Sequence, residues 1–338
     1  MIDWITAMIP LTHSKEISSG IVMSVDENGE TEWMTKKRQK VEGSYSSSIQ
    51  IKTDDINQVW ISGNPAKFLQ GHNIFGSNDV LGLNYAFFQR VAQKLNITPS
   101  TIDLKSWKEG EYEIKRIDLT TSFALRNQQD VQAWLRAATA NARGKHQNIS
   151  AYNSETVYLG QHSRRITMKV YNKYAELQKH KLPLGLPLRE KLLQYSENLL
   201  RLEVRLLSQE LKRRLLNRAK MWGNIDIINE IIRERIMTIR TNEKFRLTPN
   251  EISDLPPRLV GIYRLWTNGD DLKNIYPSRT FYRYRSEMLK HGIDITVPQP
   301  KKAEVIPLIK YLTAEHVQEI PDWSKNTPIY FEPKQYVG

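Results

Sequence analysis

Three short segments of this chain alternate strictly between apolar and polar residues, and this pattern constrains the fold more than any other feature. The segments are 116–122 (RIDLTTS), 166–171 (ITMKVY) and 200–206 (LRLEVRL). Successive side chains of a strand point to opposite faces of a sheet, so each segment can bury one apolar face. The opposite faces carry Asp118, Tyr171 and Glu203 among cations, which are Arg116, Lys169, Arg201 and Arg205.

These polar residues would lie on one surface if the three strands pair in one sheet. Asp118 and Glu203 could then begin a site for Mg²⁺ or Mn²⁺, because hard cations take oxygen ligands. Tyr171 could attack a phosphodiester there, while the cations hold the nucleic-acid strand. The alternative is a half-exposed sheet face whose charges form ordinary salt bridges.

The other segments favour an α+β fold, with a largely antiparallel sheet and flanking helices, because strands and helices do not alternate regularly. Asn28-Gly29 is the expected turn of a hairpin, since both residues tolerate positive φ, and Asn78 is the expected N-cap of a helix. The expected strands are 2–9, 21–25, 31–41, 47–52, 57–62, 113–123, 156–160, 165–171 and 199–206, and the expected helices are 78–96, 128–142, 172–180, 189–197 and most of 207–240.

The C-terminal part of the sequence indicates a separate helical region. The polar, proline-bearing stretch 241–257 is a candidate boundary, and three short helices are expected after it, at 258–269, 270–275 and 279–291. The last helix carries cations that suit a helix-turn-helix unit lying on DNA; they are Arg279, Arg283, Arg285 and Lys290. The alternative is a small helical cap with a solvated basic face.

The segment 63–76 (GNPAKFLQGHNIFG) is rich in Gly, Asn and Pro, and this composition predicts a loop. His72 lies in it between Gly71 and Asn73, where the backbone can approach a ligand closely. We therefore count His72 as a candidate metal ligand, with a solvated loop histidine as the alternative.

The net charge of +12 points to a polyanionic partner, with nucleic acid ahead of an anionic membrane. The excess lies between residues 101 and 300, because residues 1–100 carry 9 basic and 10 acidic side chains. Basic residues interleaved with aromatic ones suit single-stranded nucleic acid. The alternative interpretation is an ordinary solvated basic surface. The chain has no cysteine and no P-loop or GxGxxG motif, which disfavours thiolate chemistry, ATPases and dinucleotide enzymes.

Five blocks of the sequence resemble the gene II replication initiators of filamentous bacteriophages. They are Met1-Ile2-Asp3, Pro65 to Gly76, Arg116-Ile117-Asp118, Tyr171 with Lys173 and Glu176, and Leu200 to Arg205. The segments Tyr263-Arg264-Leu265-Trp266 and Gly292 to Ile295 extend the resemblance toward the C-terminus.

The resemblance implies a rolling-circle initiator that nicks one strand of double-stranded phage or plasmid DNA at the origin. A tyrosine becomes linked to the 5′-phosphate, the free 3′-hydroxyl primes synthesis, and the displaced strand is later rejoined in a topoisomerase-like step. Tyr171 matches the position of the nucleophile, with Tyr174 as the rival, and Lys173 could stabilise phosphate charge or lower the pKa of the tyrosine. The implied cofactor is Mg²⁺ or Mn²⁺, held by Asp118, Glu203 and His72.

The resemblance also implies an organisation and a setting. We expect a nicking–joining endonuclease domain at 1–215, similar to HUH endonucleases but without their His-hydrophobic-His pair, a helical DNA-binding region at 216–300 and a tail at 301–338. The implied partners are origin DNA and the host helicase and polymerase. No apolar run or basic leader suggests a membrane or secretion, so the expected location is the host bacterial cytoplasm.

Two other functions compete with this reading. A non-enzymatic origin-binding protein or repressor would use the same basic face and the C-terminal helices. An RNA-binding protein would use the cations and the interleaved aromatic residues. Nicking of origin DNA distinguishes both from the enzyme.

Overall fold

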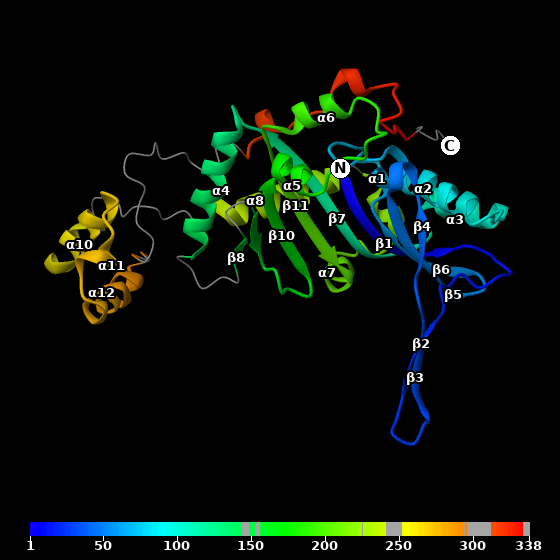
Figure 1. Cartoon of the computed structure of the whole chain (residues 1–338), viewed down its shortest axis with the longest axis horizontal. Coiled ribbons are helices and arrows are strands. Elements are labelled where there is room, and N and C mark those ends of the chain that lie inside the picture. The colour runs from blue at the N-terminus through cyan, green and yellow to red at the C-terminus, as the bar shows by residue number, and fades with distance from the viewer. Residues whose placement is uncertain are drawn as a thin grey trace.

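One large antiparallel sheet organises the first two thirds of the chain (Figure 1). The structure is a computed structural model and describes residues 1–143, 149–152, 156–224, 226–240, 252–291, 293, 295 and 312–333. The sheet has nine strands among these residues, in the order β4-β5-β6-β1-β7-β11-β10-β9-β8. The strands are β1 (Ile2–Pro10), β4 (Gln39–Glu42), β5 (Ser48–Asp55), β6 (Gln58–Gly63), β7 (Glu113–Ala124), β8 (Ile149–Tyr152), β9 (Thr156–Leu159), β10 (Ile166–Asn172) and β11 (Leu199–Leu207).

Helices cover one face of this sheet and form a single core with its apolar side chains. The strands contribute alternating residues such as Ile5, Ile117 and Leu202, each 0% exposed. Packing against them are α2 (Val80–Lys94), α3 (Thr101–Glu109), α4 (Gln128–Arg143), α7 (Ser208–Arg213), the 3₁₀ turn η2 (Ala219–Trp222) and α8 (Asp226–Arg240). This arrangement confirms the expected α+β fold with an antiparallel sheet, and it leaves the polar alternates on the other face.

A smaller cluster packs at one end of the sheet and involves a distant part of the chain. It combines α5 (Lys173–Lys179), α6 (Arg189–Ser196) and the loop 71–76 with residues 312–333, which we call the C-terminal strap. The strap contains the 3₁₀ turns η4 (Ala314–His316) and η5 (Asp322–Ser324), and it buries Ile329 completely. The strap is drawn in red beside α6 in Figure 1.

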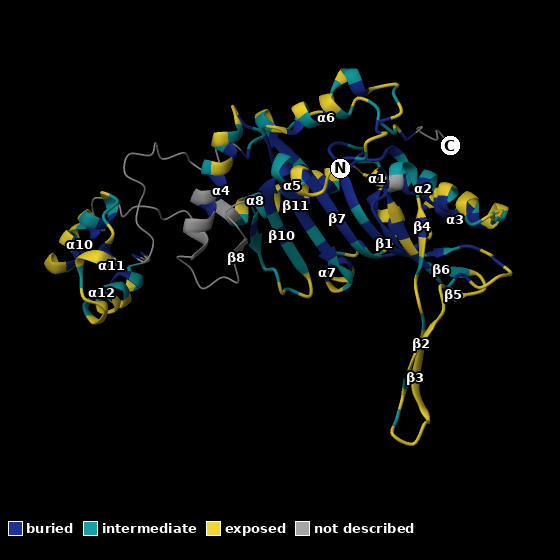
Figure 2. Ribbon diagram, in the orientation of Figure 1, coloured by how far each residue is buried: buried dark blue, intermediate teal, exposed yellow. Residues whose placement is uncertain are grey.

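The hairpin β2 (Ile21–Val25) and β3 (Thr31–Lys36) projects from the sheet as a two-stranded ribbon exposed along almost its whole length (Figure 2). The expected turn residues are at its tip, but Gly29 has a positive φ of 84° and Asn28 does not. Instead, Asp26 closes the turn, because its carboxylate accepts the N–H groups of Asn28 and Glu30. Asn28 and Gly29 therefore lie in the turn as expected, but only Gly29 takes a positive φ, and Asp26 closes the turn.

The C-terminal helices form a small unit with its own core. They are α10 (Pro257–Thr267), α11 (Leu272–Ile275) and α12 (Ser278–Lys290), close to the three expected ranges. Leu259, Trp266, Phe281 and Met288 are among the buried residues that hold them together. No helix in the described part of the chain is long and apolar enough to span a membrane.

Several elements differ from the sequence-based expectation. The predicted loop 63–76 contains α1 (Pro65–Gln70), which Asn64 caps by accepting the Lys67 N–H. The N-cap of α2 is Asp79 instead of Asn78, because the Asp79 carboxylate accepts the Gly82 N–H. Strand β8 and helix α3 were not expected.

The core of the nine-stranded sheet and its helices, which we call the first unit, extends past residue 215, where the first domain was expected to end. Helix α8 packs Ile228 and Ile231 into this core. Of the candidate boundary 241–257, residues 241–251 lie outside the described part of the chain.

Candidate active site

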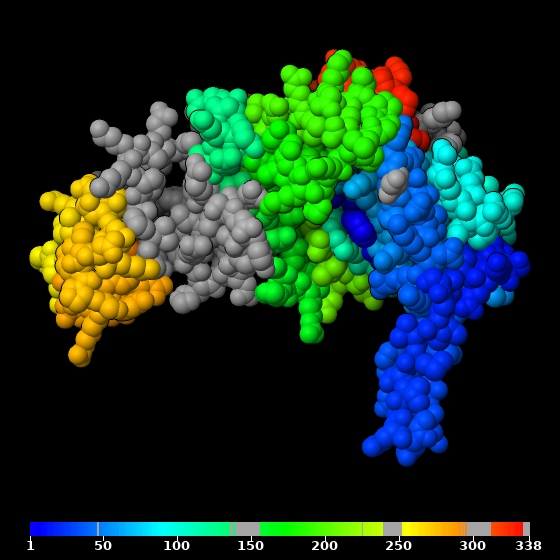
Figure 3. Space-filling model, viewed as in Figure 1, coloured from blue at the N-terminus to red at the C-terminus, as the bar shows by residue number. Residues whose placement is uncertain are grey.

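The polar faces of β7, β11 and β10 lie side by side, as the alternation predicted. Strand β11 pairs with β7 so that Glu203 lies opposite Thr120, and with β10 so that Glu203 lies opposite Lys169. Asp118, Tyr171 and Glu203 therefore share one surface on three neighbouring strands. Figure 3 shows a hollow in this face of the molecule, between the segment drawn bright green and the segment drawn blue.

Asp118 is held by two arginines of the open face. Arg116 donates to both carboxylate oxygens, at 2.8 Å from Nε and 2.5 Å from its terminal nitrogen, and Arg205 Nε approaches at 3.2 Å. The carboxylate side chain is 2% exposed, whereas the side chains of Arg116 and Arg205 are 26% and 37% exposed. The arginines thus neutralise Asp118 and remain accessible to an anionic ligand.

Glu203 lies between two other carboxyl groups. Burial, together with the negative charges of Asp3 and Asp118, raises its pKa to about 7. The positive charges of Lys169 and of Arg205, which lies at 3.6 Å and also binds Asp118, oppose this rise. Like charges at close range disfavour a third ionised carboxylate, so Glu203 is the group here that gains most from an added cation.

Asp3 belongs to this site and was not among the predicted site residues. It comes from β1, is 8% exposed, and accepts hydrogen bonds from Asn64 Nδ2 at 3.0 Å and Asn73 Nδ2 at 2.8 Å. Plain alternation would place Asp3 on the core face with Ile5. A register shift between Ile2 and Trp4, typical of a β-bulge, lets it reach the polar face.

The chemistry of the donor set fits Mg²⁺ or Mn²⁺ in part. Asp3, Asp118 and Glu203 supply carboxylate oxygens, which these cations prefer. However, in the described ranges no three His, Asp or Glu side chains form a ready-made metal cage. Mg²⁺ commonly takes one or two carboxylates and completes its shell with water and substrate phosphate, so an open site of this kind can hold it.

Tyr171 lies at the end of β10, directly before the residue that caps α5. It is 4% exposed, and Lys169 Nζ is 4.0 Å from the centre of its ring. Burial raises the pKa of Tyr171 well above its ordinary value, and the positive charge of Arg201 opposes that rise. A pocket lined by Tyr171, Lys169, Glu176 and Tyr158 opens beside it. The rival, Tyr174, is in the first turn of α5 and is partly exposed.

Lys173 is completely buried, and its ammonium group donates hydrogen bonds to two side chains. Its Nζ donates to Asn73 Oδ1 at 2.9 Å and to Glu176 Oε2 at 2.7 Å. Burial and the nearby charge of Arg201 lower the pKa of Lys173 to about 8. Lys173 thus links the loop 71–76 to α5 and places a positive charge beneath the site.

His72 is completely buried, and both of its ring nitrogens are hydrogen-bonded. Nε2 donates to the Ile329 carbonyl at 2.7 Å, and Nδ1 accepts the Ile74 N–H at 3.1 Å. Burial lowers the pKa of His72 to about 3. The lone pair of Nδ1 accepts a backbone N–H, and Nε2 carries the proton that it donates, so neither nitrogen is available to a metal. This placement does not fit the expected role of metal ligand. His72 instead fastens the loop 71–76 to the C-terminal strap.

Arg201 has a similar structural role. It is 1% exposed, and it donates to the carbonyls of Asn73 and Ile74 and to Ser122 Oγ. The expected DNA contact does not fit this placement, because the guanidinium is buried and occupied by the protein. Its charge still acts on Tyr171 and Lys173 at short range.

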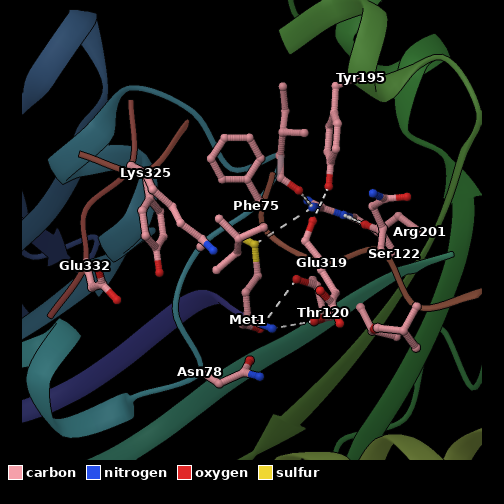
Figure 4. A pocket seen from close by; sticks show the side chains of 17 residues that line it. Met1, Phe75, Asn78, Thr120, Ser122, Tyr195, Arg201, Glu319, Lys325 and Glu332 are labelled. Atoms are coloured by element: carbon pink, nitrogen blue, oxygen red, sulfur yellow. Dashed lines mark hydrogen bonds between the residues drawn. The ribbon is translucent and has the colours of Figure 1, made fainter. Parts of the chain in front are cut away.

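A second pocket is lined by the sheet, by the loop 71–76 and by the C-terminal strap (Figure 4). Met1, Phe75, Tyr195 and Arg201 line it together with strap residues such as Glu319. The Tyr195 hydroxyl donates to the Glu319 carbonyl at 2.5 Å, and the α-amino group of Met1 donates to the Thr120 carbonyl at 2.6 Å. The strap therefore forms one wall of the cavity next to the site.

The remaining predicted DNA contacts lie on α12. Arg279, Arg283 and Lys290 are exposed, and Arg285 is partly exposed. Arg279, Arg283 and Lys290 recur at helical spacing and share one face of α12. Phe281 and Met288 are on its buried side. This helix thus presents a basic surface to solvent.

Comparisons with known proteins cover nearly the whole chain. The family of the N-terminal part of the phage gene II replication-associated protein matches residues 1–225, and the family of its C-terminal part matches residues 247–330. The replication-associated protein of this family from Enterobacteria phage I2-2 is 35% identical over 326 residues, which are 93% of this chain and 94% of that protein. The protein of the same name from Enterobacteria phage fd is 24% identical, over 80% of this chain and 78% of its own length.

Among solved structures, a rolling circle replication initiator protein from Geobacillus stearothermophilus matches with a TM-score of 0.27 and 12% identity. It covers 64% of this chain and 78% of its own. The two family matches together span both the sheet and the C-terminal helices, and the relative from phage I2-2 aligns over 93% of this chain. The chain therefore belongs to the gene II replication-associated protein family of filamentous phages.

Proposed function

We propose that this protein initiates rolling-circle replication by nicking one strand of origin DNA through Tyr171. One observation carries the proposal: a tyrosine, three carboxyl groups and two accessible arginines meet on the open face of one sheet. A protein that only bound DNA would gain nothing from Asp3, Asp118 and Glu203, which repel phosphate. The membership of the replication-associated protein family supports a role in replication.

The proposed reaction exchanges one phosphodiester for another. Tyr171 Oη loses its proton as it attacks the phosphorus, the bond from phosphorus to the 3′-oxygen breaks, and that oxygen takes up one proton and leaves as a 3′-hydroxyl. The 5′-phosphate stays on the tyrosine, and attack by a 3′-hydroxyl reverses the step and rejoins the strand. No ATP is needed, which agrees with a sequence that has no P-loop.

The raised pKa of Tyr171 means that its phenolate must be stabilised during attack. Arg201 lowers that pKa through its charge, and Lys169 lies against the ring. Lys173 acts from behind, by holding Asn73 and Glu176 in position. Arg116 and Arg205 are placed to meet the phosphates of the bound strand.

A divalent cation, Mg²⁺ or Mn²⁺, is the proposed cofactor. Asp118 and Glu203 would hold it, with Asp3 at the same surface, and it would polarise the scissile phosphate. Asp118 must then share its charge between the cation and its two arginines. Origin DNA is the proposed macromolecular partner, with the host helicase and polymerase acting on the nicked product.

The test is incubation of the purified chain with supercoiled origin plasmid and Mg²⁺. The expected product is a nicked circle with protein on its 5′ end. Tyr171→Phe should abolish the covalent product, because the hydroxyl is the nucleophile, whereas the matched variant Tyr174→Phe should keep it. Nicking by Tyr171→Phe at the parental rate would refute the assignment of Tyr171.

The exposed cations of α12 favour a second candidate, an origin-binding protein without nuclease activity. Binding of origin DNA with no cleavage in Mg²⁺ or Mn²⁺ would support it against the enzyme. Loss of cleavage with retained binding in Asp118→Asn and Glu203→Gln would support the enzyme.

A further inference from the structure

Two tryptophans lie on the open face of the sheet, on the side of the carboxylates away from Tyr171. Trp4 is on β1 and Trp60 is on β6, and both are partly exposed. Their strand neighbours Ile5 and Ile61 are 0% exposed, because they point into the core on the opposite face. The proposed chemistry uses neither tryptophan.

Each tryptophan is paired with an arginine. The Arg38 guanidinium lies 4.3 Å from the centre of the Trp60 ring, and the Arg116 guanidinium lies 5.2 Å from that of Trp4. A cation beside an aromatic ring offers a phosphate contact and a flat stacking surface in one place. We call Arg38, Trp60, Trp4 and Arg116 the tryptophan track.

The track is continuous with the candidate active site. Arg116 also binds Asp118, and Trp4 Nε1 donates at 3.0 Å to Ser62 Oγ on β6, two residues from Trp60. Strand β6 is next to β1, and β1 is next to β7, which carries Asp118. A strand that leaves the carboxylates across β1 therefore meets Trp4 first and Trp60 next.

We propose that the tryptophan track binds unpaired bases of the DNA strand that enters the candidate active site. The bases stack on Trp4 and Trp60, and Arg116 and Arg38 contact the phosphates between them. That the bound strand continues into the active site rests on the proposed function, whereas the binding of unpaired bases by the track does not. If the arginine–tryptophan pairs only stabilised the sheet, their replacement would not change the affinity for single-stranded DNA.

The experiment measures the affinity of the full chain for a short fluorescent oligothymidylate, by fluorescence anisotropy in EDTA so that no cleavage occurs. Trp60→Ala should weaken binding about tenfold or more, as expected for the loss of one stacking side chain. Trp60→Tyr should restore most of the affinity, because it keeps an aromatic face. Trp33→Ala is the matched control, since Trp33 is 53% exposed on the projecting hairpin, outside the track.

A second arm separates stacking from charge. The same oligonucleotide without bases keeps its phosphates, so the parent should bind it less tightly, and Trp60→Ala should cause no further loss. Equal affinity of Trp60→Ala and Trp33→Ala for oligothymidylate would overturn the proposal, as would parental affinity for the base-free strand. Thermal denaturation of each variant shows that the fold is kept.

This readout is independent of the proposed nicking. The anisotropy measurement is made in EDTA, where no strand is cut, so it reports binding alone. A parent that binds the strand through Trp60 but never nicks origin DNA would refute the proposed function and leave the track standing. If the parent nicks origin DNA but Trp60→Ala binds oligothymidylate as the parent does, the tryptophan track is refuted and the proposed function stands.

Discussion

The carboxyl groups of Asp3, Asp118 and Glu203 differ in how the protein compensates their charge. Asp118 has two arginines and Asp3 has two asparagine amides, whereas Glu203 shares Arg205, at 3.6 Å, with Asp118, has Lys169 nearby and has two negative neighbours. The raised pKa of Glu203 follows from this difference and from burial. Without a cation, the folded chain is therefore strained electrostatically at Glu203 when the pH is above neutral.

Replacement of Glu203 by Gln should stabilise the chain at high pH when no divalent metal is present. The folded state prefers the protonated carboxyl, so the stability of the parent is lost as the pH rises from the ordinary Glu value of 4.5 through about 7. Thermal denaturation in EDTA at pH 5 and pH 8 should show the gain of Glu203→Gln growing toward pH 8, to about 3 kcal/mol.

The exposed pair residue Glu109 provides the control, because Glu109→Gln should change stability equally little at both pH values. Added Mg²⁺ at pH 8 should then raise the melting temperature of the parent more than that of Glu203→Gln. A gain for Glu203→Gln that is the same at pH 5 and pH 8 would show that the carboxyl is not destabilised by its neighbours.

At the scale of the element, alternation in β7, β10 and β11 was sufficient to predict which side chains share the open face. Each of these strands pairs in register without a bulge across the site, so the period of two holds. In β1 the register shifts, and Asp3 was missed because strict alternation assigns it to the core face. A bulge depends on the partner strand, which a single sequence does not show.

The loop 63–76 was predicted in part, for a similar reason. Its Gly, Asn and Pro content correctly marks chain reversals, but Asn64 and Pro65 also begin a short helix. The expected role of His72 rested on its place in a glycine-rich loop and on the family resemblance, and that of Arg201 on the polar face of its strand. Burial decided both, because His72 and Arg201 bond to backbone groups of this loop and of the C-terminal strap.

Helix α1 ends at a glycine that its geometry requires. Gly71 has a φ of +87°, and an added Cβ would lie 2.4 Å from Tyr45 Cδ2 and 2.8 Å from Leu186 Cδ1. Gly71→Ala should therefore lower the free energy of unfolding by at least about 1–2 kcal/mol, measured by urea denaturation. It should also weaken nicking, because the loop that follows supplies Asn73 to Asp3 and Lys173.

Gly185→Ala is the matched control for this prediction. An added Cβ at Gly185 meets nothing within 4 Å, so the same chemical change should leave stability almost unaffected. Equal unfolding free energies for Gly71→Ala and Gly185→Ala would mean that the end of α1 adapts without strain.

At the scale of the whole molecule, the chain leaves the sheet, builds the helices α10 to α12, and returns to the sheet as the C-terminal strap. The tail that we expected at 301–338 gave no sign of this return, because its contacts are made with residues more than 100 positions away in the sequence. Gln318 N donates to the Ser122 carbonyl at 2.8 Å, and Phe331 N donates to Gln70 Oε1 at 2.9 Å. The basic helices are thus linked covalently at both ends to the unit that holds the site.

Truncation after residue 311 should destabilise the first unit and reduce nicking together. It removes the buried Ile329 and leaves His72 Nε2 and Gln70 Oε1 without their strap partners, at about 1–3 kcal/mol for each buried polar group.

The melting temperature and nicking of the truncated chain should both fall. The pKa of His72 should rise from about 3 toward its ordinary value, which NMR titration can follow. Added peptide 312–333 should restore part of the loss. If the truncated chain melts and nicks as the parent does, the strap contributes nothing to the site, and the loop 71–76 must be held by Arg201 and Lys173 alone.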